Sequence, residues 1–67
     1  METKFPNIDE ELRKRDMTYR DLASELNMPP MNLYRRLTGV TQWSLPEVVA
    51  VCEFFGRDDA LTLFTIR

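Results

Sequence analysis

The chain has 67 residues, which is enough for one small domain and too few for two. Hydrophobic residues make up 43% of it, too large a share for a disordered segment, so we expect a compact core. Its formal net charge is −2, with nine basic and eleven acidic residues. Any attraction to an anionic polymer must therefore depend on where the basic residues gather.

Cysteine and histidine usage excludes several kinds of site. Cys52 is the only cysteine and the chain has no histidine, so neither an internal disulfide nor a zinc site of the usual spacing is possible. We interpret Cys52 as a small buried hydrophobic residue and expect no metal or other cofactor. No apolar run approaches the roughly 20 residues of a membrane-spanning helix, and no signal-peptide pattern follows Met1. We therefore expect a cytoplasmic protein.

A first helix is predicted after the extended start "KFPN". Asn7 is expected to be its N-cap, with Glu10 three residues later completing a capping box. Ile8 and Leu12 are one helical spacing apart and should face inward. Asp16 marks the expected end of this helix.

A second helix is predicted in "YRDLASELN", with Thr18 as its N-cap. Leu22 and Leu26 form an i, i+4 stripe on its inner side. Asn27 suits the left-handed backbone conformation that ends a helix.

A third helix is predicted to start at Pro29 and Pro30. Proline is tolerated in a first helical turn, because the backbone N–H there has no partner anyway. Leu33 and Leu37 provide the buried side of this helix, and Gly39 stops it.

A fourth helix is predicted in "LPEVVAVCEFFG", opened by a capping box of Ser44 and Glu47 and closed by Gly56. Trp43, in the loop before it, is expected to plug the core between the third and fourth helices. The residues of the fourth helix expected to face inward are Leu45, Val48, Val49, Cys52 and Phe55.

The C-terminal tail has two interpretations. It can form a short helix capped by Asp58, with Leu61 and Phe64 facing inward, or a strand in which Leu61 and Leu63 alternate with Phe64 and Ile66. We favour the helix. The predicted fold is therefore all-α, a compact bundle of four to five short helices.

Three residues between positions 18 and 39 have a characteristic spacing. Ala23 is a small residue in the middle of the second helix, Asn27 stands at the turn four residues later, and Leu33 follows six further on. In this order they resemble the helix-turn-helix of the lambda repressor/Cro (Xre-like) family of DNA-binding regulators. The resemblance extends over roughly residues 7–56 and implies a single helix-turn-helix DNA-binding domain, 1–67, with the motif at 18–39.

Two features depart from the family pattern. Proline occupies both positions at the exit of the turn, Pro29 and Pro30, which shortens the set of side chains that read bases. Arg36 stands where many relatives have an apolar residue, so Leu37 is expected to take over its packing.

Positive charge is concentrated around the motif. Residues 13–36 contain six basic residues against three acids, a net charge of +3, whereas residues 1–12 carry −3 and residues 37–67 carry −2. Because affinity for DNA depends on the local field at the phosphates, the overall negative charge does not exclude DNA binding. It predicts modest nonspecific affinity and a shallow salt dependence.

The third helix is expected to enter the major groove. Asn32 can pair with adenine, Arg35 can pair with guanine, and Met31 can contact a thymine methyl group. Tyr34 is the fourth expected base contact. The expected contacts to the DNA backbone are Thr18, Tyr19 and Arg20, where the resemblance implies them, together with Arg36, Thr41 and Gln42.

An enzyme is not expected, because the chain has no histidine, no glycine-rich phosphate loop and no nucleophile with a nearby base. The resemblance implies a transcription regulator similar to small phage repressor or Cro proteins, more like a Cro-type protein since no ligand-sensing domain is present. It would act on double-stranded operator DNA in a bacterial host cell. The alternative is a protein-interaction module, such as an antirepressor or antitoxin-like partner, that keeps the fold without reading DNA.

A homodimer is expected, at least on DNA, because the family usually binds pseudo-palindromes as dimers. A monomer this small would have difficulty covering the whole apolar tail. The expected dimer contacts are Leu61, Leu63, Phe64 and Ile66.

Overall fold

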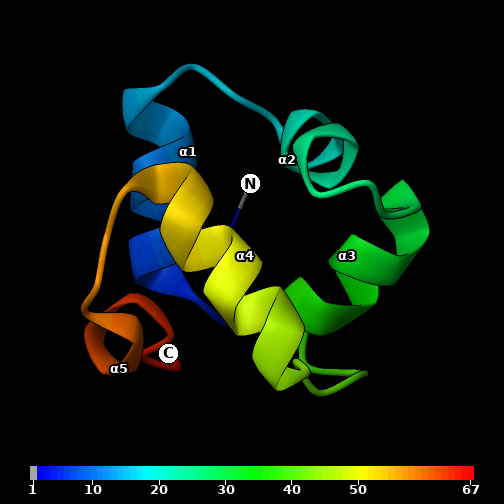
Figure 1. Cartoon of the computed structure of the whole chain (residues 1–67). Coiled ribbons are helices and arrows are strands. Elements are labelled where there is room, and N and C mark those ends of the chain that lie inside the picture. Colours follow the sequence, from blue (N-terminus) through cyan, green and yellow to red (C-terminus); the bar gives the residue numbers. More distant parts are fainter. Residues whose placement is uncertain (1) are drawn as a thin grey trace.

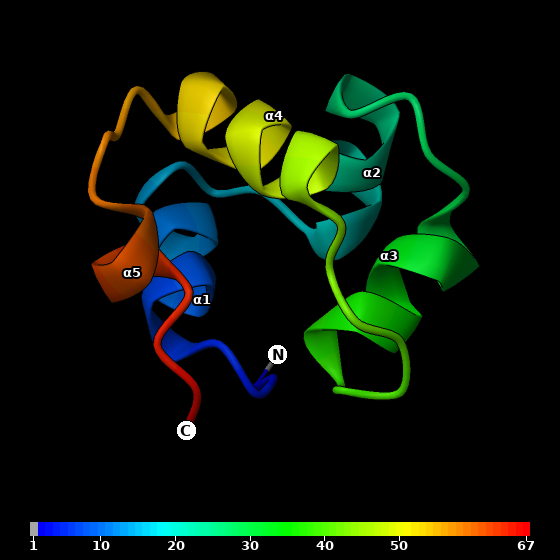
Figure 2. The same ribbon diagram turned by 60° about the horizontal axis from the view of Figure 1, so that its bottom comes forward.

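Five helices form the fold. The computed structural model describes residues 2–67, with helices α1 (Pro6–Lys14), α2 (Tyr19–Glu25), α3 (Pro30–Leu37), α4 (Leu45–Phe55) and α5 (Ala60–Leu63). No strand occurs in these residues, so the predicted all-α fold is confirmed. None of these helices has the length and apolar character needed to cross a membrane. α4 lies between α1 and α5 on one side and α2 and α3 on the other (Figure 1 and Figure 2).

α1 begins earlier than predicted, at Pro6. Phe5 occupies the N-cap position without a side-chain cap, so the prediction that Asn7 caps this helix is wrong. Proline suits the first helical position because its fixed φ is already helical, and Pro6 therefore draws Asn7 into the first turn. The Asn7 Nδ2 group donates instead to the Thr62 carbonyl oxygen at 2.7 Å, which ties α1 to the C-terminal segment.

The start of α2 and the turn between α2 and α3 both have the predicted geometry. The Thr18 hydroxyl accepts a hydrogen bond from the Asp21 N–H at 3.2 Å, and the Asp21 carboxylate accepts one from the Thr18 N–H at 2.9 Å. Asn27 adopts the left-handed conformation, with φ of 56°. Ala23 and Leu33 have no exposed surface, so a small residue stands where α3 packs closely on α2.

α4 has both predicted ends but a different inward face. Ser44 and Glu47 form the capping box, and Gly56 ends the helix at φ of 69°. Leu45 is 75% exposed and Val49 is 46% exposed, so their predicted inward position is wrong. Nearly every residue of α4 is apolar, and spacing alone therefore does not select a face. The residues that pack inward follow an i, i+3, i+4, i+7 pattern and are Val48, Val51, Cys52 and Phe55.

The C-terminal segment contains α5, so the helical interpretation of the tail is confirmed over the strand. Its inward residue is Leu63, which has no exposed surface, whereas Leu61 was predicted to face inward and is 95% exposed. Asp58 does not cap α5. Asp59 stands at the N-cap position, and its carboxylate accepts a hydrogen bond from Arg57 Nε at 2.8 Å instead of capping the helix.

Trp43 joins the two ends of the chain. Its ring meets the Phe5 ring edge-on, with 6.0 Å between centroids, and the Phe64 ring at 5.1 Å. Trp43 therefore packs on the core as predicted, although its aromatic partners come from the chain ends. The Arg67 N–H also donates to the Lys4 carbonyl oxygen at 2.7 Å, which holds the terminal segments together.

Candidate nucleic-acid interface

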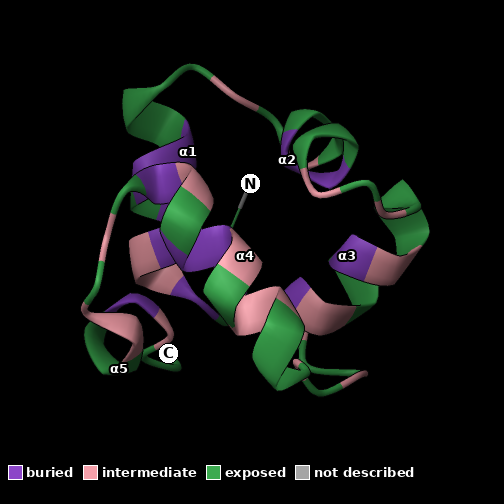
Figure 3. Cartoon of the chain, viewed as in Figure 1, coloured by how far each residue is buried: buried purple, intermediate pink, exposed green. Residues whose placement is uncertain are grey.

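α3 presents one buried side and one open side. Leu33 and Leu37 have no exposed surface and hold the helix on the core. Met31 is 56% exposed, Tyr34 is 39% exposed, and Arg35 is also exposed. The exposed residues of α3 lie toward the outer side of this half of the molecule (Figure 3). The open face therefore combines apolar surface with a guanidinium group.

The first turn of α3 offers few free amides. Pro30 has no N–H, and the N–H groups of Asn32 and Leu33 donate to the Pro29 carbonyl oxygen at 3.0 and 3.2 Å. A helix start normally attracts phosphate through unpaired N–H groups, and this start is poorly equipped to do so. Recognition at this end of α3 must rely on side chains, of which Asn32 is half-buried.

Two tyrosines connect α2 to α3. The Tyr19 and Tyr34 rings lie 5.5 Å apart between centroids, tilted at 47°. The Arg20 guanidinium lies over the Tyr19 ring, 5.6 Å from its centroid. Aromatic pairs at this distance contribute about 0.5–1.5 kcal/mol beyond area burial. The pair therefore supports the position of Tyr34 on the open face of α3.

Three further candidates for contact with the DNA backbone are polar, namely Thr18, Thr41 and Gln42. The Thr18 hydroxyl accepts the cap hydrogen bond, which leaves its O–H free to donate to another group. Thr41 and Gln42 lie in the loop after α3, where Thr41 is half-buried and Gln42 is exposed. The Thr41 N–H donates to the Arg35 carbonyl oxygen at 3.2 Å, which fixes this loop to the end of α3.

Arg36 turns toward α4. Its Nε donates to Glu47 Oε1 at 2.8 Å and its Nη1 donates to the Asn32 carbonyl oxygen at 3.0 Å. Glu47 Oε1 also accepts the Ser44 N–H at 2.9 Å. Burial opposes ionisation of Glu47, but hydrogen bonds from Ser44 and Arg36 outweigh it and hold the pKa of Glu47 below its ordinary value. The positive charge of Arg36 is thus largely neutralised within the fold.

Three basic side chains make no ion pair within residues 2–67, namely Lys4, Arg20 and Arg35. Lys4 was not predicted as a candidate. Its N–H donates to the Leu37 carbonyl oxygen at 2.9 Å, and its Cγ lies 3.6 Å from the place that a Cβ on Gly39 would occupy. Lys4 therefore lies at the end of α3, although no sequence signal connects it to that helix.

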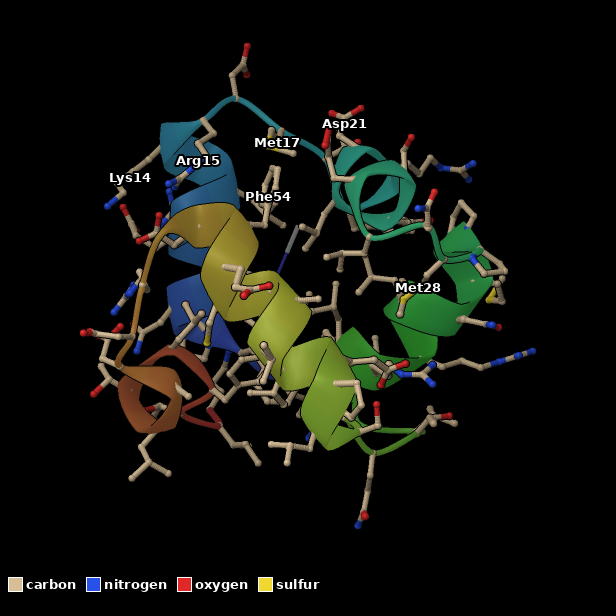
Figure 4. The ribbon with its side chains drawn as sticks, viewed as in Figure 1. Lys14, Arg15, Met17, Asp21, Met28 and Phe54 are labelled. Carbon is tan, nitrogen blue, oxygen red and sulfur yellow. The ribbon has the colours of Figure 1, made fainter. Side chains whose placement is uncertain are left out.

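The three consecutive basic residues before α2, Arg13 to Arg15, form ion pairs with acidic residues of α1. Arg13 pairs with Glu10, and Lys14 and Arg15 both pair with Glu11. Lys14 and Arg15 lie on the α1 side of the molecule, with α3 on the opposite side (Figure 4). Their charges do not add to the open face of α3.

The expected dimer residues separate into two groups. Leu61 is 95% exposed and Ile66 is 67% exposed, and with half-buried Phe64 they border an open groove of about 590 Å³ that Trp43 also lines. Leu63 has no exposed surface, so the prediction that it contacts a partner is wrong. The buried side of a one-turn helix is committed to the core of its own chain.

Comparison with known proteins identifies one family. A family model described as a Cro/C1-type HTH DNA-binding domain matches residues 7–58. No curated protein and no solved structure matches the chain. The matched segment contains all of α2, α3 and α4, with the turn between α2 and α3.

Proposed function

Because the chain belongs to the Cro/C1-type helix-turn-helix DNA-binding domains, we propose that it is a sequence-specific regulator of transcription. In this proposal it acts as a single domain on operator DNA in a bacterial host cell, where it blocks or redirects polymerase as small phage repressor and Cro proteins do. The observation that carries the proposal is the charge distribution. Arg20 and Arg35, on α2 and α3, are free of ion pairs within the described residues, whereas the basic run of α1 is paired with acids.

Base reading is assigned to the open face of α3. Arg35 is exposed and unpaired, and it can donate two hydrogen bonds to a guanine. Asn32 can pair with adenine in the same way. Met31 and Tyr34 supply apolar contacts to the major groove. This assignment gives the readout to side chains of α3, because the two prolines leave the backbone of its first turn with few free N–H donors.

Phosphate contacts are assigned to the borders of that face. Thr18, Tyr19 and Arg20 provide them at the start of α2, and Thr41 and Gln42 provide them in the loop after α3. Lys4 joins this group because it is unpaired and lies beside Gly39. Arg36 is the weakest of the backbone candidates, since Glu47 already accepts its Nε.

A dimer is part of the proposal. The chain measures 25 × 25 × 22 Å, and the half-sites of helix-turn-helix dimers lie about 34 Å apart, so one chain covers one half-site. The second copy packs on the side of α5, where Leu61 and Ile66 are exposed beside the groove. Sedimentation should give a dimer on operator DNA, which Leu61→Glu disrupts and Val49→Glu does not. If Leu61→Glu leaves the protein-to-DNA stoichiometry unchanged, the proposed dimer contact on the side of α5 is overturned.

The test of the function uses the duplex that wild-type protein enriches from a random pool. Arg35→Ala and Asn32→Ala should each lower the ratio of specific to nonspecific affinity, by about 1–3 kcal/mol for a lost bidentate contact. Lys14→Ala removes a charge from the opposite side and is the matched control. If both α3 variants keep the wild-type sequence preference, α3 does not read DNA, and a protein-interaction module becomes the better account.

A further inference from the structure

The segment of residues 3–5, which precedes α1, lies between the end of α3 and Arg67 (Figure 2). The Lys4 N–H donates to the Leu37 carbonyl oxygen at 2.9 Å, and the Lys4 carbonyl oxygen accepts the Arg67 N–H at 2.7 Å. The other two residues of the segment are buried, whereas Lys4 is exposed. The segment therefore presents one side chain at the surface, and that side chain is a cation beside the helix assigned to DNA.

Every backbone polar group of this segment has a partner. The Thr3 N–H donates to Asp9 Oδ2 at 2.8 Å, and the Thr3 carbonyl oxygen accepts from Arg67 Nε at 2.9 Å. The Phe5 N–H donates to the Thr3 hydroxyl oxygen at 3.0 Å, and the Phe5 carbonyl oxygen accepts the Asp9 N–H at 3.0 Å. The two backbone bonds of Lys4 complete the set. Segments near a chain end are poorly ordered unless they are tied down, and here the backbone that carries Lys4 is tied at each group.

The side chains of Asp9 and Arg67 are the centre of this network. Asp9 is 7% exposed, and its carboxylate accepts the Thr3 N–H, the Thr3 hydroxyl at 2.8 Å and Arg67 Nη2 at 3.0 Å. The planar guanidinium of Arg67 bridges two acceptors, because its Nε meets the Thr3 carbonyl oxygen while its Nη2 meets Asp9. Asp9 is covered and anionic and cannot attract a phosphate, and the charge of Arg67 is paired within the fold.

Lys4, in contrast, makes no ion pair within residues 2–67. Its Cγ and Cε lie 3.6 and 3.9 Å from the place that a Cβ on Gly39 would occupy, so the stem of the side chain lies on Gly39 at the end of α3. A fixed backbone reduces the conformational freedom that binding must remove from a long side chain. On the basis of the proposed function, we infer that Asp9 and Arg67 are positioning residues that hold Lys4 at the end of α3, where it binds a DNA phosphate.

Asp9→Asn separates positioning from simple electrostatics by the sign of its effect. Loss of a negative charge should by itself strengthen binding to DNA. An amide cannot accept all three hydrogen bonds of the carboxylate, so Lys4 should be released and affinity should fall instead. The slope of log K against log salt should then decrease in magnitude by about 0.9, the value for one phosphate contact. Glu10→Gln is the matched control. It removes an exposed acid from the same helix and should bind as tightly as wild type or more tightly.

Arg67→Ala is the second variant, at a side chain that is 46% exposed, and it keeps the test valid if Asp9→Asn does not fold. It should lower the salt slope by the same amount. In a Lys4→Ala background neither variant should lower the slope or the affinity further, because both act through Lys4. A purely structural loss would persist in that background, and a direct phosphate contact by Arg67 would lower the slope a second time. Circular dichroism checks that each variant is folded at the temperature of the binding assay.

The inference and the proposed function fail in different ways. The inference is overturned if either variant, once shown to be folded, keeps the wild-type salt slope, or if its effect adds to that of Lys4→Ala. Tighter binding by Asp9→Asn also overturns it. In each of these cases wild-type protein still prefers the selected duplex over a scrambled one. Absence of that preference overturns the proposed function itself.

Discussion

Replacing Glu47 by glutamine tests how much the ion pair between Arg36 of α3 and Glu47 of α4 stabilises the fold. Arg36 Nε donates to Glu47 Oε1 at 2.8 Å, and the two side chains are 19% and 21% exposed. Glutamine keeps an oxygen that can accept from Arg36 and from the Ser44 N–H, so the substitution removes mainly the charge. Hydrogen bonds to charged groups contribute about 1.5–3 kcal/mol, and exposed ion pairs about 0.2–1 kcal/mol. For a pair with this partial exposure we expect a loss of about 1 kcal/mol, or about 4–8 °C in Tm.

The loss of stability caused by Glu47→Gln must depend on pH. The pKa of Glu47 is held below its ordinary value of 4.5, so its contribution to stability is complete above pH 4.5 and is lost as pH falls through the lowered pKa. Thermal unfolding followed by circular dichroism should therefore show a difference between wild type and Glu47→Gln at pH 7 that shrinks below pH 4.5. Glu53→Gln, on the same helix and without an ion pair within residues 2–67, is the control. An equal Tm for wild type and Glu47→Gln at pH 7, or a difference in Tm that does not shrink as the pH is lowered below 4.5, refutes this account of the pair.

Three further predictions concern charge, packing and backbone conformation. Lys4→Ala should reduce the slope of log K against log salt for DNA binding by about 0.9, the value for one phosphate contact, whereas equal slopes would remove Lys4 from the interface. Ala23→Val adds volume at a position with no exposed surface, so it should lower the free energy of unfolding, measured with urea, by about 1–3 kcal/mol. Ser24→Val, on the exposed side of α2, should lower it less. Gly56→Ala has open space for its Cβ but a φ of 69°, so it should destabilise by about 1–2 kcal/mol through backbone strain alone. Gly56→Asn should recover part of that loss, and a neutral Gly56→Ala would contradict the strain.

The sequence was most informative where a structural signal spans only a few residues. The Thr18 and Ser44 caps are confirmed, as is the left-handed turn at Asn27, because each depends on hydrogen bonds or φ preferences within three or four positions. The small residue at Ala23 and the aliphatic residue at Leu33 also lie in a fixed local order. A local signal gave a wrong prediction at Asn7, because the preference of proline for the first helical position placed the start of α1 at Pro6 and left Asn7 inside the helix.

Features that depend on distant segments were not predictable. Val49 and Val51 are both apolar residues of α4, and only packing against the rest of the chain determines that Val51 is buried. The pairing of Arg36 with Glu47 joins residues eleven positions apart on different helices. Lys4 reaches the end of α3 through a backbone hydrogen bond to Leu37, and no local pattern encodes that contact.

The central claim is that α3 reads DNA sequence, and selection from a random duplex library at low salt tests it most directly. The claim predicts enrichment of an inverted repeat whose half-sites are separated by about one helical turn, about 34 Å centre to centre. It also predicts that Arg35→Ala, carried through the same selection, loses the preference at one position of each half-site. If wild-type protein enriches no sequence and binds all duplexes weakly, with strong dependence on salt, the claim is contradicted.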